Sequence, residues 1–308
     1  MSKVASFLKV TRANVVFVMI VPVALAAVGA LTWNHTFHPL LFLLTVVGAA
    51  AIHLFSNMIN DLWDYRNEVD TTAQETEGSI STNSGFLTQG IWSEKRFAAV
   101  TWILFAVALV CGLILAYASG YMILVYGVLG ALIAYYYVAP PIRFGYRGKG
   151  YSEVAILLAF GVLPVLGSYY VQTSQYDNRA LLVSLPVGIL TTLVLFNHHF
   201  LHWRADKAAG KNTLVVVFGE NRALRFSAFM VILAYLSLIL AIFYGALPVY
   251  ALFALLTAFP LIRLYRSLQP TNPSEAYLPL MGASVNAAVS CGAVMILALL
   301  VQWWVERM

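Results

Sequence analysis

A cluster of carboxylates follows the second long apolar run of the chain. Four acids fall within eleven residues there, Asp61, Asp64, Glu68 and Asp70, and Asn60 begins the segment. On one continuous helix, Asn60, Asp64 and Glu68 would repeat every four residues and share a face. Acids beside an apolar run repel each other and lose hydration, and a hard divalent cation with several oxygen ligands removes both problems. The cluster therefore predicts a Mg²⁺ site; the alternative is a helix end that is simply acidic and hydrated.

A second polar group lies at the end of the sixth apolar run. His198, His202 and Asp206 recur every four residues, so one helical face would carry all three. Imidazole and carboxylate together suit a transition metal, although hydrogen bonds within a helix bundle would also account for the histidines. Lys207 and Lys211 follow Asp206, and this order indicates an anion beside a metal.

A third group of candidate residues is basic. Arg143, Arg147 and Lys149 fall in a glycine-containing turn ahead of an apolar run. Cations together with the free N–H groups of a helix N-terminus suit a phosphate, and the alternative is the ordinary positive charge of a cytoplasmic loop. The tyrosines at 135–137 precede this turn and could form an interfacial belt or face a carbocation.

Acids for Mg²⁺, bases for phosphate and aromatic rings beside apolar helices all fit one kind of ligand, a lipid diphosphate. The helices that must position these groups are predicted from composition. The chain has 308 residues, of which 61% are hydrophobic and only 10% are charged, and this is typical of a polytopic membrane protein. We expect an all-α, single domain over 1–308. Nine runs are long enough to span a bilayer: 14–33, 39–60, 96–118, 121–139, 153–172, 179–202, 223–245, 247–267 and 281–305.

The distribution of charge predicts the orientation. With the N-terminus inside, only Arg179 and Arg307 of the 18 Lys and Arg residues fall on the outer side. The positive-inside rule therefore explains the basic composition better than a nucleic-acid partner does. We expect an integral protein of the inner (cytoplasmic) membrane, with its active site on the cytoplasmic side. The first run is expected to be a span rather than a cleaved signal.

These motifs resemble a known family. The segment from Asn60 to Asp70 resembles the first aspartate-rich motif of the UbiA superfamily of intramembrane prenyltransferases, and the segment from Asp206 to Lys211 resembles the end of its second motif. Segments 84–90, 146–148 and 161–173 are similar to the branch that contains 1,4-dihydroxy-2-naphthoate prenyltransferase.

The resemblance implies nine helices around a central cavity that opens sideways to lipid, and two Mg²⁺ ions that bridge a diphosphate to the two motifs. Asn60, Asp64 and Glu68 take the ligand positions of the first motif, and Asp61 and Asp70 match further acids of the branch. Asp206 takes the last acid of the second motif. His202 stands where that motif usually has an aspartate, so the second metal and the number of metals stay open, as do the roles of His198, His199 and His202.

The predicted activity is Mg²⁺-dependent transfer of a polyprenyl group from its allylic diphosphate to an aromatic acceptor, 1,4-dihydroxy-2-naphthoate, in menaquinone biosynthesis. 4-Hydroxybenzoate, homogentisate and a lipid glycerol are alternative acceptors. Two other classes of function also fit: a cation transporter, and a non-catalytic protein that binds a quinone lipid. We expect the catalytic residues to be Asp61, Asp64, Glu68, Asp70 and Asp206, the metal ligands to be Asn60, Asp64, Glu68, His202 and Asp206, and the diphosphate-binding residues to be Arg143, Arg147, Lys149, Lys207 and Lys211.

Overall fold

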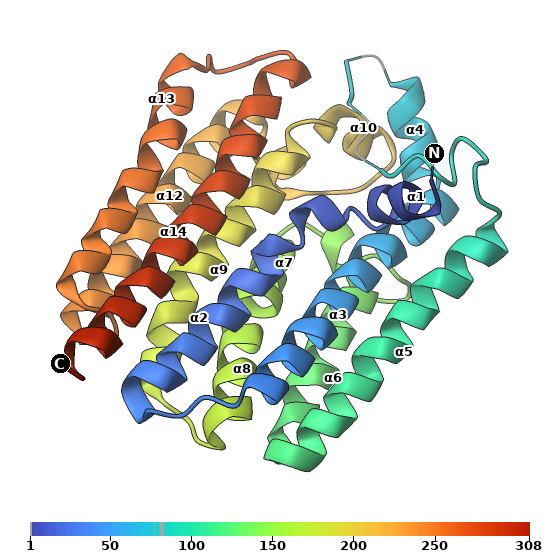
Figure 1. The fold of residues 1–308 in the computed structure, drawn as a ribbon. Helices are drawn as coiled ribbons and strands as arrows, with labels where there is room; N and C mark the ends of the chain where they lie inside the picture. The colour runs from blue at the N-terminus through green and yellow to red at the C-terminus, as the bar shows by residue number, and fades with distance from the viewer. Residues whose placement is uncertain (1, 77, 81–82) are drawn as a thin grey trace.

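The regular structure is helical throughout the part of the chain that the computed structural model describes, residues 2–76, 78–80 and 83–308. Figure 1 shows the long helices side by side in a bundle, with the N-terminus near one end and the C-terminus at the other. The helices that run along the bundle are α2 (Phe17–Asn34), α3 (Pro39–Arg66), α5 (Glu94–Ser119), α6 (Met122–Tyr136), α7 (Tyr151–Leu157) continued through the π-helical turn η3 (Leu158–Val162) into α8 (Leu163–Thr173), α9 (Asn178–His199), α12 (Glu220–Phe243), η4 (Val249–Ala258) continued into α13 (Phe259–Ser267), and α14 (Leu278–Val305).

Eight of the nine predicted spans are confirmed as helices long and apolar enough to cross a membrane within the described residues. The ninth, predicted at 121–139, is the apolar helix α6, which has only 15 residues. The sixth span, predicted to end at residue 202, ends at His199. The apolar pattern finds the spans because a bilayer supplies no hydrogen-bond partners, so each crossing segment must satisfy its backbone within a helix.

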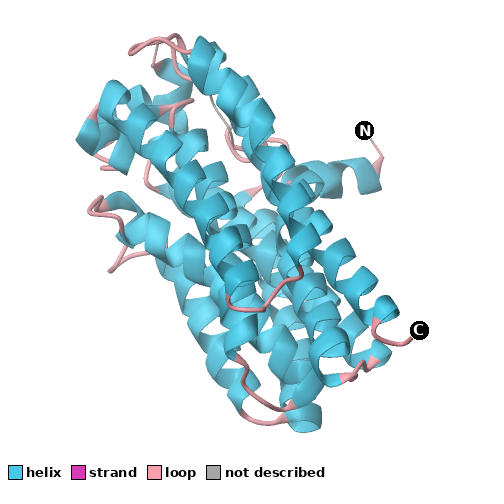
Figure 2. Ribbon diagram, turned by 90° about the vertical axis from the view of Figure 1, so that its left-hand side faces the viewer, coloured by secondary structure: helices cyan, strands magenta, loops and turns pink. Residues whose placement is uncertain are grey.

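The spanning helices form a closed ring. Each packs against the next along the chain, and α14 packs back against α2. Short helices cover the end of the bundle near the N-terminus: α1 (Lys3–Val10), η1 (Ala13–Val15), α4 (Val69–Glu75), η2 (Phe144–Tyr146), α10 (Trp203–Ala208), α11 (Leu214–Phe218) and η5 (Ser274–Tyr277). Figure 2, turned by 90°, shows the N-terminal helix running across the axes of the spanning helices.

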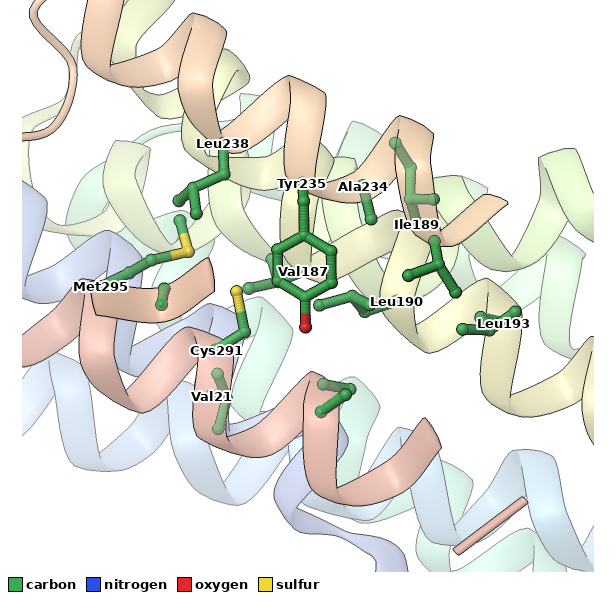
Figure 3. Packing of buried hydrophobic residues seen from close by; sticks show 14 of the residues in the cluster. Val21, Val187, Ile189, Leu190, Leu193, Ala234, Tyr235, Leu238, Cys291 and Met295 are labelled. Carbon is green, nitrogen blue, oxygen red and sulfur yellow. The ribbon is translucent and has the colours of Figure 1, made fainter. Parts of the chain in front are cut away.

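The largest buried core joins α2, α9, α12 and α14. Figure 3 shows Tyr235 of α12 packed among Val187 and Leu190 of α9 and Cys291 of α14. The hydroxyl of Tyr235 lies 2.8 Å from that of Thr257, so its one polar atom has a partner. This half of the ring is therefore a packed wall against which the functional end of α9 is held.

One close approach between helices fixes the course of α9 beside the π-helical turn. A Cβ on Gly161 would lie 2.6 Å from the Cα of Gly188, so only glycine fits there. Small residues let helix backbones approach closely in membranes, where van der Waals packing rather than a hydrophobic force joins the helices.

Candidate active site

The acidic end of α3 supplies the first side of the site. Asn60 and Asp64, one helical turn apart, lie together there, with the Asn60 amide donating to Asp64 Oδ2 at 3.2 Å. Asp61 points elsewhere: it is 3% exposed, forms an ion pair with Arg12 and accepts from the backbone N–H of Ser84 at 2.9 Å. Asp61 therefore anchors the N-terminal segment and the loop at Ser84 to α3.

The expectation that Glu68 shares the helical face of Asn60 and Asp64 is wrong. Helix α3 ends at Arg66, and Glu68 adopts a left-handed backbone with φ of 60°, so the chain turns there into α4. Glu68 is exposed, whereas Asp70, in the first turn of α4, is brought back to the cavity that Asn60 and Asp64 line. The turn, rather than the helical repeat, decides which acid joins the site.

The second side of the site comes from the end of α9. His198, His202 and Asp206 do not share one continuous helix as expected, because α9 ends at His199 and α10 begins at Trp203. They still meet: the rings of His198 and His202 are 4.8 Å apart, and His202 Nε2 lies 3.5 Å from Asp206 Oδ2. The intervening turn thus keeps the three side chains together without a helical repeat.

Lys211 joins the two sides. Its Nζ donates to Asp64 Oδ2 at 3.0 Å, and both side chains are buried. Its backbone N–H donates to the carbonyl of Asp206 at 2.7 Å. Tyr146 donates its hydroxyl to the other oxygen of Asp64. Asp64 and Asp206 therefore lie at the same end of the bundle, around one ammonium group.

Together these groups line a polar chamber of about 50 Å³. Its lining includes Arg12, Asn60, Asp64, Asp70, Asn83, Tyr137, His198, His199, His202, Asp206 and Lys211. The chamber adjoins an apolar cavity of about 520 Å³ between α2, α3, α6, α9 and α14. Arg12, Asn60, Tyr137 and His198 line both spaces and so mark the junction.

The apolar space continues beyond the junction. A further cavity of about 260 Å³, lined by α3, α5, α6 and α8, shares Met19, Ile52, Gly130 and Ala159 with the apolar cavity. A ligand with a charged head and a long hydrocarbon tail would find both environments in one continuous path.

Only one of the predicted phosphate-binding bases lines the chamber. Lys211 lines the chamber, whereas Arg147, Lys149 and Lys207 are exposed, and Arg143 is partly buried outside the lining of the chamber. Arg12, one of the 16 bases that the charge distribution places on the cytoplasmic side, also lines the chamber. Its one sequence signal is its place at the start of the first span, with no acid near it in the chain.

The chamber is lined by carboxylate and amide oxygens, which are the kinds of ligand that a divalent cation prefers. Both carboxylate oxygens of Asp206 are buried without a hydrogen-bond partner among the described residues, and a bound cation would supply the missing interaction. In the same part of the chain, no three His, Cys, Asp or Glu side chains are close enough to hold a metal alone. Asn60, Asp64, Asp70 and Asp206 are therefore fitting ligands that still need oxygens from a bound substrate.

Burial changes the protonation of the groups around Lys211. It raises the pKa of Asp206 to about 7, with Lys211 opposing and the charge of Asp64 adding to the shift. Burial and the charges of Asp64 and Asp61 raise the pKa of Asp70 to about 7. Burial alone would lower the pKa of Lys211, but the charges of Asp64 and Asp206 raise it well above its usual range. Burial and the charge of Lys211 lower the pKa of His202 well below its usual range.

The raised pKa of Asp206 predicts a pH-dependent stability. With a folded-state pKa of about 7 and an unfolded one near 4, Asp206 destabilises the fold increasingly as pH rises from about 4 to about 7. We expect Asp206→Asn to match the wild type in thermal stability near pH 4 and to exceed it at pH 7, in detergent with a chelator. A wild type more stable than the variant at pH 7 would contradict this.

Fold and site together define a class: an integral membrane protein whose polar chamber, lined by acidic and basic side chains, adjoins a hydrocarbon-lined cavity. The comparison with known families agrees, because the sequence model described as the UbiA prenyltransferase family matches residues 19–286. The chain belongs to this family, and it is a prenyltransferase of UbiA type.

Characterised relatives share a modest fraction of the sequence. The chain is 28% identical to 1,4-dihydroxy-2-naphthoate octaprenyltransferase of Escherichia coli K12, over 92% of each chain. It is 24% identical to the Bacillus subtilis 168 protein of the same name, over 77% of this chain and 74% of that one. The fold matches the apo structure of a UbiA homolog from Aeropyrum pernix K1 with a TM-score of 0.67 at 17% identity, covering 94% of this chain and 98% of that one.

A second solved structure has a similar fold: a UbiA homolog from Archaeoglobus fulgidus bound to GPP and Mg²⁺. Its TM-score is 0.66 at 18% identity, covering 94% of this chain and 99% of that one. At these identities the two structures establish the shared fold.

Proposed function

We propose that this protein transfers a polyprenyl group from its diphosphate to 1,4-dihydroxy-2-naphthoate, a step of menaquinone biosynthesis. The observation that carries the proposal is the continuity of the polar chamber with the apolar cavity, with Asp64, Lys211 and Asp206 at one end and hydrocarbon side chains at the other. The 1,4-dihydroxy-2-naphthoate octaprenyltransferases among the relatives support the choice of acceptor.

In the proposed reaction the diphosphate lies in the polar chamber and the prenyl chain lies in the apolar cavity. Lys211 and Arg12 are the cations nearest to the leaving group, and their charge favours ionisation of the allylic C–O bond. The apolar cavity excludes water, so the allylic cation reacts with the aromatic acceptor rather than with water. Tyr137 lies at the junction, so its ring can face that cation.

We propose that a divalent cation, Mg²⁺ first, binds with the diphosphate. Asn60, Asp64, Asp70 and Asp206 would hold it together with phosphate oxygens, and it would neutralise the charge that develops on the leaving group. The charge pattern of the loops further supports a site on the cytoplasmic side of the inner membrane.

A substitution at His202 tests how many Mg²⁺ ions bind. A neutral imidazole is a weaker Mg²⁺ ligand than a carboxylate, so we expect His202→Asp to bind Mg²⁺ at least as tightly as the wild type in the presence of a diphosphate. Isothermal titration with Mg²⁺ and geranyl diphosphate measures both affinity and stoichiometry. A loss of both Mg²⁺ binding and transfer would show that the imidazole has a separate role.

The proposed function is tested by incubating the purified protein in lipid vesicles with Mg²⁺, labelled polyprenyl diphosphate and a panel of acceptors. The panel contains 1,4-dihydroxy-2-naphthoate, 4-hydroxybenzoate, homogentisate and a glycerol lipid. We expect a prenylated naphthoquinol product, with release of inorganic diphosphate and loss of the carboxyl group of the naphthoate as CO₂. Transfer to another member alone would replace the proposed acceptor, and no transfer to any member would refute the proposed function.

A further inference from the structure

His53 is a buried polar residue in the wall of the apolar cavity. Its side chain lines the cavity, and the residue is only 3% exposed. His53 precedes Asn60 by seven residues on α3, so it lies on the same helical face, about 10 Å further from the chamber along the helix axis. A polar ring at that depth is not explained by binding of a diphosphate.

The neighbouring polar groups of this wall are already satisfied. The hydroxyl of Ser56 donates to the carbonyl of His53 at 2.7 Å, and that of Thr191 donates to the carbonyl of Val187 at 2.8 Å. The amide of Asn57 donates to the carbonyl of Thr11 at 3.0 Å.

One ring nitrogen of His53 has no hydrogen-bond partner among the described residues. Its Nε2 lies 3.4 Å from the amide nitrogen of Asn57, a group that only donates, so Nε2 is the acceptor and Nδ1 carries the proton. Nδ1 is buried and has no hydrogen-bond partner among the described residues. The ring is held edge-on against Phe160, with centroids 5.3 Å apart. A ligand oxygen beside this ring would satisfy a donor that is otherwise costly to bury.

We propose that His53 positions the aromatic acceptor by donating a hydrogen bond from Nδ1 to a ring hydroxyl. The prenyl chain has no oxygen to offer, and the diphosphate lies at the other end of the polar face. A hydroxylated aromatic ring placed between the junction and His53 would have its reacting carbon near the allylic carbon and its far oxygen near the imidazole. The inference rests on the proposed function and specifies which kind of acceptor the cavity selects.

The test compares two probes that differ by one hydroxyl: 1,4-dihydroxy-2-naphthoate, and 1-hydroxy-2-naphthoate, which lacks the hydroxyl at ring position 4. Their Kd values are measured by calorimetry, without donor, for the wild type and for His53→Leu, His53→Gln and His53→Asn. We expect the wild type to bind the dihydroxy probe about tenfold more tightly. His53→Leu and His53→Gln should lose that preference. His53→Asn, whose amide nitrogen lies near the place of Nδ1, should keep most of it.

Binding of inorganic diphosphate should be unchanged in every variant, because His53 does not line the chamber that is proposed to hold the diphosphate. His35→Leu, an exposed histidine outside both cavities, is the matched control. If His53→Leu does not fold, His53→Gln carries the test. A wild type that binds both probes equally, or variants that keep the full preference, would overturn the proposal. A wild type with the expected preference but no prenyl transfer would refute the proposed function and leave the role of His53 in place.

Discussion

Replacing Asp64 by asparagine is expected to lower kcat/KM for prenyl transfer by about 10²–10³-fold while the protein still folds. Asp64 accepts from Lys211 and Tyr146 and lies beside Asn60, so it is the carboxylate around which the two sides of the chamber meet. Asparagine keeps the shape and removes the charge that would hold a cation. The measurement is steady-state transfer in vesicles, with Mg²⁺ affinity measured on the same samples.

The matched control for this variant is Asp177→Asn. Asp177 caps α9 before its first residue, at the other end of that helix from His199, and asparagine is an equally good cap. Its transfer rate should stay within about twofold of the wild type, because Asp177 lies at the opposite end of α9 from the chamber and asparagine keeps the oxygen that caps the helix. Near-normal turnover of Asp64→Asn would remove Asp64 from the proposed cation site.

The second large effect is expected from Lys211→Met. This change leaves Asp64 buried without its ammonium partner, and breaking a buried ion pair from one side costs about 3–5 kcal/mol of stability. The double variant Lys211→Met/Asp64→Asn removes both charges and should recover most of that stability, but it should not recover transfer. Unfolding in detergent and transfer in vesicles measure the two effects separately.

Lys95→Met, an exposed lysine near the start of α5, is the stability control and should change unfolding by less than about 0.5 kcal/mol. If Lys211→Met were as stable as Lys95→Met, the ion pair with Asp64 would not contribute to the fold. If the double variant regained transfer, the charges of Asp64 and Lys211 would not be needed for the reaction.

The fold was predictable because a bilayer imposes one rule on every crossing segment. A run of about 20 apolar residues satisfies its own backbone as a helix, so hydropathy located the spans. The rule is weakest at the ends of helices. The sixth span ends at His199 rather than at residue 202, because apolar character continues past the last helical residue into Phe200 and Leu201.

The kinds of residue in the candidate site were also predictable from the sequence. Which individual residues line the chamber was predictable only in part. Helical periodicity correctly placed Asn60 beside Asp64, because both lie within α3. The same rule placed Glu68 with them, and there it was wrong, because the left-handed turn at Glu68 ends the repeat. The match to the family motif had predicted Asp70 as a site residue, but no local pattern indicated that it would lie on a separate helix, α4.

The sequence by itself determined the kind of protein: helices long enough for a bilayer, acids and bases at one rim, and the motifs of the UbiA family. Only the tertiary structure decided which of those charges meet. Lys211 reaches Asp64 across 147 residues, and Arg12 reaches Asp61 across 49. Periodicity predicts neighbours within one helix, whereas contacts between helices depend on how the whole ring packs, and that packing is a property of all the spans together.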